Sequence, residues 1–104
     1  MLALAMADWF DFDNAILIGT DGRPVELTAQ ERALVEALRP GGLKRRDVLV
    51  VAVWPGECAP ESAYDRALEQ LASRVRDKLA AAGYNPQALR ARRFLGYQLD
   101  EERL

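Results

Sequence analysis

The chain has 104 residues, of which half are apolar and 29% are charged, and its formal net charge is −2. This length allows one domain with one hydrophobic core, and the composition is that of a globular protein rather than a disordered one. The apolar opening Met1 to Ala7 is too short to cross a bilayer and lacks the basic flank of a signal peptide. We therefore expect one domain over residues 1–104, in the cytoplasm and without a membrane partner.

The residue types that carry most catalytic chemistry are scarce. Cys58 is the only cysteine and histidine is absent, so Ser-His and Cys-His pairs, an internal disulfide and a metal cage of the usual ligands are excluded. The seven glycines form no phosphate-binding loop, and no carboxylates form a recognisable pair in an apolar setting. We predict that the protein is not an enzyme and uses no cofactor or metal.

Charge is distributed unevenly along the chain. Residues 1–38 carry seven acids and two bases, whereas residues 66–93 carry seven bases and two acids. A local basic face matters more to nucleic acid than the total charge does. A solvated helix beside a charged loop would have the same composition, so charge alone leaves both interpretations open.

The first third of the chain predicts antiparallel strands. Aromatic and β-branched residues cluster over 9–13 and 16–18, which is typical of strands. Asp21-Gly22 separates the second cluster from Val25-Glu26-Leu27 and is a strong hairpin signal. We therefore expect an N-terminal antiparallel sheet within residues 9–27.

The first helix is predicted to begin at Thr28. The Thr28 hydroxyl can accept from the backbone N–H of Glu31, and the Glu31 side chain can reach back, which makes a capping box. Apolar residues follow at helical spacing. The predicted helix covers residues 28–39, and Pro40-Gly41-Gly42 ends it.

The segment from Arg45 to Trp54 is ambiguous. Residues 48–53 are apolar throughout, which favours a buried strand by propensity. Ten residues between two loops also fit a short buried helix. The residues alone leave both structures open.

The clearest helix covers residues 60–82, with Pro60 in its first turn and Gly83 as its C-terminal cap. One side of it is apolar at about 100° per residue. The opposite arc carries Arg66, Gln70, Ser73, Arg74 and Asp77. Arginine, glutamine and serine on an exposed helix face can reach base edges and phosphates in a major groove, although many surface helices look similar.

Residues 89–99 predict a β-hairpin, because two extended runs flank a turn that contains glycine. The pattern places Arg90, Arg92 and Arg93 on its first strand, where successive side chains point to opposite faces. Three like charges repel one another in so small a hairpin. We therefore expect an anionic partner at this hairpin.

The order and spacing of four segments resemble the OmpR/PhoB-type winged-helix effector domain of bacterial response regulators. The matching segments are DGRPVELTAQERALVEAL (21–38), RRDVLVVAVW (45–54), RALEQLASRVRDKL (66–79) and LRARRFLGYQL (89–99). The resemblance implies an α+β fold, a winged helix-turn-helix with an N-terminal antiparallel β-sheet, three helices and a C-terminal β-hairpin wing. It makes 45–54 the second helix, 60–82 the recognition helix and 89–99 the wing.

The resemblance also implies sequence-specific binding of double-stranded DNA by a transcriptional regulator, with a homodimer on DNA left open. In the family, residues that match Gln70 and Arg74 face the bases, and the one that matches Arg93 enters the minor groove. Residues that match Arg66, Ser73 and Arg76 contact the DNA backbone. The candidate DNA-binding residues are Arg66, Gln70, Ser73, Arg74, Arg76, Arg90, Arg92 and Arg93.

The sequence departs from the family's pattern at several positions. Val48 and Val51 stand where the family tends to have exposed glutamate, and Phe94 replaces the first glycine of the wing. Arg45 stands where the family has a capping serine or threonine. No receiver domain precedes the winged helix, so we expect a regulator that acts alone, a domain encoded apart from its sensor, or a fragment of a longer regulator.

A second function stays open, that of a protein-interaction module which docks through the second helix with little or no DNA binding. The apolar surface of this helix and the overall negative charge favour it. Its partner would be RNA polymerase, which the loop over 55–61 contacts in some members of the family, or a separate sensor or receiver protein. Its candidate residues are Val48, Val51, Gly56 and Glu57. Alternatively, the N-terminal strands or residues 1–7 cover the two valines.

Overall fold

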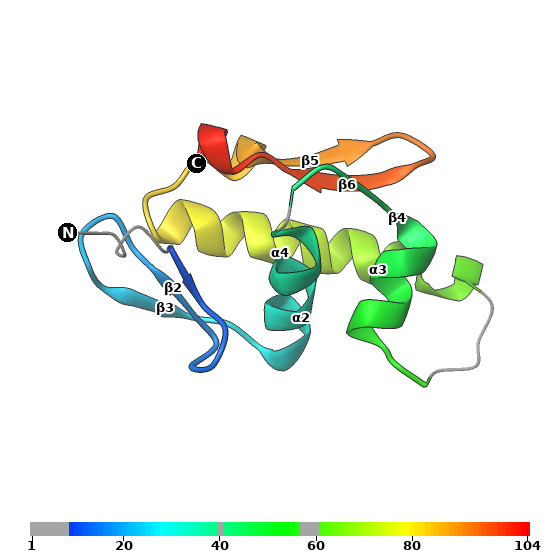
Figure 1. The fold of residues 1–104 in the computed structure, drawn as a ribbon, viewed down its shortest axis with the longest axis horizontal. Helices are drawn as coiled ribbons and strands as arrows, with labels where there is room; N and C mark the ends of the chain where they lie inside the picture. Colours follow the sequence, from blue (N-terminus) through cyan, green and yellow to red (C-terminus); the bar gives the residue numbers. More distant parts are fainter. Residues whose placement is uncertain (1–8, 40, 57–60) are drawn as a thin grey trace.

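A computed structural model describes residues 9–39, 41–56 and 61–104, and its chain path is shown in Figure 1. Three strands form an N-terminal sheet in the order β1-β2-β3, and both pairings are antiparallel. The strands are β1 (Phe10–Asp11), β2 (Ile16–Ile18) and β3 (Pro24–Glu26). The predicted hairpin turn lies between β2 and β3, where Gly22 has a φ of 85°. The expected sheet is therefore confirmed.

The predicted capping box begins helix α2 (Ala29–Leu38). The Glu31 N–H donates to the Thr28 hydroxyl at 3.2 Å, and the Thr28 N–H donates to the Glu31 carboxylate at 2.8 Å. Two backbone donors that the helix leaves unpaired are satisfied in this way. The predicted bounds of this helix agree with the structure to within a residue.

The ambiguous segment forms helix α3 (Arg46–Val53), as the resemblance implied. Leu49, Val50 and Val53 are buried, while Val48 and Val51 are exposed. This spacing is that of one helix face, so burial against the other helices overrides the strand propensity of valine. Arg45 makes no side-chain cap, but the Asp47 carboxylate accepts the Val48 N–H at 2.8 Å.

A strand that the sequence did not predict precedes this helix. It is β4 (Leu43–Arg45), which pairs antiparallel with the second strand of the hairpin, Lys44 lying opposite Tyr97. Three residues carry too little pattern to identify a strand. Its formation depends on the edge that the hairpin offers for hydrogen bonding, a long-range feature.

Helix α4 runs over Asp65–Ala81 and follows a 3₁₀ turn, η1 (Glu61–Tyr64). The predicted start at residue 60 is therefore wrong for residues 61–64, and Pro60 lies outside the described residues. At the other end the predicted glycine cap is confirmed. Gly83 has a φ of 89°, and the Tyr84 N–H donates to the Leu79 carbonyl at 2.9 Å, which makes a Schellman motif.

The hairpin consists of β5 (Leu89–Arg92) and β6 (Gly96–Leu99), and with β4 it forms a sheet in the order β4-β6-β5. The predicted hairpin is confirmed, but the placement of Arg93 on its first strand is wrong. β5 ends at Arg92, which lies opposite Gly96, so Arg93 belongs to the turn. A Cβ at Gly96 would overlap the Lys44 carbonyl oxygen, so glycine lets β4 and β6 approach closely.

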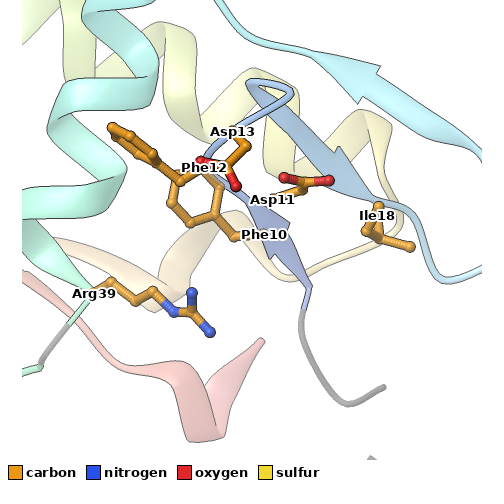
Figure 2. A pocket seen from close by; sticks show the side chains of 6 residues that line it. All are labelled: Phe10, Asp11, Phe12, Asp13, Ile18 and Arg39. Carbon is orange, nitrogen blue, oxygen red and sulfur yellow. The ribbon is translucent and has the colours of Figure 1, made fainter. Parts of the chain in front are cut away.

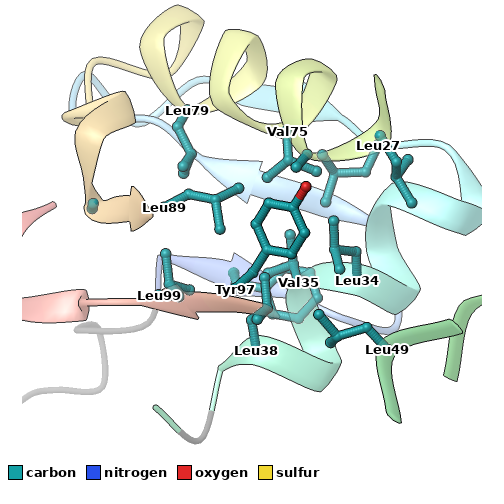
Figure 3. Close-up of a cluster of buried hydrophobic side chains, with 14 of the residues drawn as sticks. Leu27, Leu34, Val35, Leu38, Leu49, Val75, Leu79, Leu89, Tyr97 and Leu99 are labelled. Atoms are coloured by element: carbon teal, nitrogen blue, oxygen red, sulfur yellow. The ribbon is translucent and has the colours of Figure 1, made fainter. Parts of the chain in front are cut away.

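One hydrophobic core joins the three helices to the hairpin. Figure 3 shows Tyr97 of β6 with its ring among leucine and valine side chains and its hydroxyl directed toward Val75 of α4. Burial raises the pKa of the Tyr97 hydroxyl, and the Glu69 carboxylate adds to this shift. Leu34, Leu49 and Leu68, one from each helix, are fully buried. The core therefore holds α4 in a fixed orientation with its opposite face outward.

No helix in the described ranges is both long enough and apolar enough to span a membrane.

Candidate nucleic-acid interface

The face of α4 that turns away from the core carries the predicted polar residues. Arg66, Gln70 and Arg74 follow one another at intervals of four and are all exposed, so they form one row along the helix. Ser73 and Asp77 are exposed beside this row. The structure thus brings together four of the eight candidate DNA-binding residues, Arg66, Gln70, Ser73 and Arg74.

The exposed arginines of α4 and the hairpin are not paired with any acid of the described residues. Several other cations form ion pairs, as Lys78 does with Glu31, Arg46 with Asp65 and Arg103 with Asp100. Within the described part of the chain, no ion pair is recorded for Arg66, Arg74, Arg90, Arg92 or Arg93. Guanidinium groups bind phosphate and base edges through several N–H donors, so this surface is suited to an anionic ligand.

Arg76 lies on a different side of α4 from the outward row. It is half-buried, and its Nε donates to the Leu89 carbonyl at the start of β5, at 2.9 Å. The side chain therefore holds the hairpin against the helix. Its predicted contact with the DNA backbone stays a prediction.

The hairpin lies along α4, and its first strand, β5, runs in the direction opposite to that of the helix (Figure 1). Near its tip a hollow of about 350 Å³ separates it from the first half of α4. Arg92 and Arg93 line this hollow together with Glu69 of α4 and Arg46 of α3. Arg90 lines a second hollow near the start of β5, which Arg76 and Arg103 also line. The three predicted wing arginines thus lie beside α4 and not on a remote surface.

The two valines of α3 are exposed in the described structure, Val48 at 52% and Val51 at 67%. They line a shallow hollow with Asp47. The described N-terminal strands do not cover them, and the alternative cover by residues 1–7 lies outside the described residues. Gly56 is exposed with a φ of 81°, whereas Glu57 falls outside the described ranges.

A further hollow of about 380 Å³ lies on the N-terminal sheet. Figure 2 shows Phe10 and Phe12 in this hollow with the carboxylates of Asp11 and Asp13 and, at another side, Arg39. The Arg39 guanidinium approaches the Phe10 ring at 5.8 Å and the Glu101 carboxylate at 3.7 Å. The two acids make this hollow a poor site for a polyanion.

Sequence reasoning assigned no role to Lys78. Its Nζ donates to the Glu31 carboxylate at 2.9 Å and to the Glu26 carbonyl at 2.6 Å. Lys78 thus links α4 to the start of α2 and to β3. The sequence did contain a signal for this role, because Lys78 lies outside the helix arc that carries the other polar residues, and a cation there faces other parts of the fold.

Three helices in one core, with a polar last helix flanked by a basic hairpin, define a winged helix-turn-helix domain. Residues 22–99 match the family described as "Transcriptional regulatory protein, C terminal". The chain belongs to this family.

Two curated relatives match nearly the whole chain. It is 31% identical over 103 residues to regulatory protein VirG of Agrobacterium fabrum (strain C58), which covers 96% of this chain and 40% of that protein. It is also 31% identical over 99 residues to regulatory protein VirG of Rhizobium rhizogenes, which covers 92% of this chain and 40% of that protein. The chain therefore spans 40% of the length of each relative.

A solved structure has the same fold. It is the DNA-binding domain of the response regulator AdeR, in complex with an intercistronic region. The similarity has a TM-score of 0.69 at 25% sequence identity, and it covers 88% of this chain and 90% of that one.

Proposed function

We propose that this domain binds double-stranded DNA in a sequence-specific manner and thereby regulates transcription. The observation that carries the proposal is the outward row of α4, where Arg66, Gln70 and Arg74 are exposed with no ion pair recorded for either arginine in the described structure. A major groove admits an α-helix, and arginine and glutamine are suited to base edges. Similarity to the AdeR domain, whose structure contains DNA, supports the same function here.

Within this proposal Gln70 and Arg74 read bases, and Arg66 and Ser73 contact the backbone. The wing arginines reach the adjacent minor groove, where narrow A·T-rich sequence concentrates negative potential. Arg76 acts mainly through the wing, because its Nε is used by the Leu89 carbonyl. We assign the domain no chemical reaction, and we place it in the cytoplasm because its proposed ligand is double-stranded DNA.

DNA affinity should fall steeply with salt. If the basic surface neutralises about four to six phosphates, the log-log slope of affinity against salt should be about −3 to −6. Fluorescence anisotropy with a labelled duplex from a random-sequence pool measures it. Arg23→Ala is the control, because Arg23 lies on the N-terminal hairpin beside Asp21 and should leave the slope unchanged. A flat titration, or no binding at low salt, contradicts the proposal.

A second function is supported by α3. Two exposed valines three residues apart share one face of a helix, and exposed apolar patches often mark contact sites. We propose that this face contacts a protein, namely RNA polymerase, a separate sensor or receiver protein, or a second copy of the domain on DNA. Such a contact is compatible with DNA binding through α4.

Replacing both valines with glutamate tests this contact. The variant Val48→Glu/Val51→Glu should remain within about 1 kcal/mol of the parent's unfolding free energy, because changes at exposed positions cost little. It should keep its DNA affinity but lose self-association in analytical ultracentrifugation, or polymerase binding in a pull-down with purified enzyme. Val48→Thr/Val51→Thr is the control, because threonine keeps the shape of valine and replaces one methyl group with a hydroxyl without adding charge. Unfolding of the glutamate variant would mean that the valines are covered.

A further inference from the structure

The turn at the tip of the wing holds an unusually exposed aromatic ring. Phe94 is 78% exposed, the highest value among the large apolar residues of the described chain, and its neighbour Leu95 is 55% exposed. The ring lies outside the core cluster. The hydrophobic effect therefore gives no reason, within the described fold, for phenylalanine at this position.

The backbone at Phe94 is also strained. Its φ is 65°, in the left-handed region that residues other than glycine rarely adopt. The Leu95 N–H donates to the Arg92 carbonyl at 2.9 Å and closes a four-residue turn. Phe94 occupies the third position, where a positive φ favours glycine or asparagine. Folding alone would thus select a different residue.

The tip is held at a fixed place relative to the helices. The Arg46 N–H, at the start of α3, donates to the Leu95 carbonyl at 3.2 Å. Gly96 lies so close to the Lys44 carbonyl that no side chain fits between them. The exposed ring is therefore presented from an anchored turn and lies at the same hollow as Glu69 of α4.

Two arginines lie beside the ring in the chain. The Arg93 guanidinium lies 4.9 Å from the centre of the Phe94 ring, and Arg92 at the end of β5 is exposed. A ligand at this tip must accept an apolar ring and cations together. The minor groove meets both demands, because its sugars and base edges form apolar walls while phosphates line its rims.

We infer that Phe94 is an apolar minor-groove contact, whose ring packs against deoxyribose and base edges beside the arginines of the wing. The inference rests on the proposed DNA binding and adds an apolar element to it. Apolar side chains of this kind enter minor grooves in other DNA-binding proteins. The free energy of this contact would offset the cost of the positive φ at Phe94, a cost that the fold itself does not require.

Phe94→Gly is the decisive variant, because it removes the ring while glycine adopts the positive φ without strain. The control is Phe12→Ala, which removes an exposed phenylalanine that also lies under a guanidinium, that of Arg32 at 4.6 Å, but on the N-terminal sheet. The probe is a duplex that the wild-type domain enriches from a random library. Affinity is measured at several salt concentrations, and hydroxyl-radical footprinting reports which minor-groove sugars are covered.

We expect Phe94→Gly to bind about 5- to 20-fold more weakly, as loss of one apolar contact predicts, with an unchanged salt slope and a higher midpoint of thermal unfolding. Protection of the sugars at the wing site should be lost, while the footprint of α4 remains. Phe12→Ala should match the wild type. Equal affinity and footprint for Phe94→Gly and wild type would overturn the inference but leave the proposed function standing. Absence of duplex binding by the wild type would overturn the proposed function, and the inference with it.

Discussion

Lys78→Met should lower the free energy of unfolding by about 3 kcal/mol. Its Nζ contacts the Glu31 carboxylate at 2.9 Å, and the Glu31 side chain is only 3% exposed. Removing one partner of a buried ion pair costs about 3–5 kcal/mol, because the other charge stays buried and unpaired. We expect the lower end because Glu31 keeps the N–H of Thr28. Urea denaturation measures the change.

Methionine retains most of the lysine stem, so the loss reports the ammonium group with its contacts to Glu31 and to the Glu26 carbonyl, and not packing. The double variant Glu31→Gln/Lys78→Met is the matched control. Its neutral amide can still accept the Thr28 N–H without a buried charge, so it should be more stable than Lys78→Met alone. If the single and double variants are equally unstable, the ion pair is not the source of the loss.

The free energy of unfolding should depend on pH differently in the parent protein and in Lys78→Met. Hydrogen bonds from Thr28 and Lys78 outweigh the desolvation of the Glu31 carboxylate and hold its pKa below the ordinary value. A carboxyl with a lowered folded pKa stabilises the protein above its unfolded pKa, and this contribution is lost on acidification below about pH 4. Without Lys78 the pKa should rise, so protonation relieves the buried charge. The deficit of Lys78→Met should therefore shrink as the pH falls.

Features set by neighbouring residues were predictable from the sequence. The capping box at Thr28 and the glycine cap at Gly83 depend on hydrogen bonds within one turn of a helix. The outward row of α4 follows from helical periodicity, so Arg66, Gln70 and Arg74 were identified as one surface. These signals are local and require no knowledge of the tertiary structure.

Features set by long-range packing were not predictable in the same way. The valine-rich segment of α3 has strand propensity, and only burial of Leu49 and Val53 against other elements makes it a helix. β4 exists because β6 offers it an edge. The pairing of Arg92 with Gly96 ends β5 and places Arg93 in the turn. For the site, the candidate arginines could be identified from local spacing, whereas the hydrogen bond from Arg76 to the Leu89 carbonyl of the wing could not.

Arg74→Ala should weaken binding to the preferred duplex by about 1–3 kcal/mol, roughly 5- to 150-fold, and relax base preference at one position. Arg74 belongs to the outward row of α4, where it is exposed. In the proposed arrangement its guanidinium meets a base edge, so its loss should matter most for the sequence that carries that base. Selection from a random library, repeated with the variant, measures the change in preference.

Arg66→Ala is the matched comparison, because it removes the same charge from the same row. The two residues lie eight positions apart, about 12 Å along a helix, so one can reach a base while the other meets a phosphate. Loss of a phosphate contact should weaken all sequences alike and reduce the salt slope by about 1. If Arg74→Ala instead weakened every duplex equally while Arg66→Ala changed base preference, α4 would enter the groove by its other end. The pair of variants therefore fixes the direction of α4 on DNA.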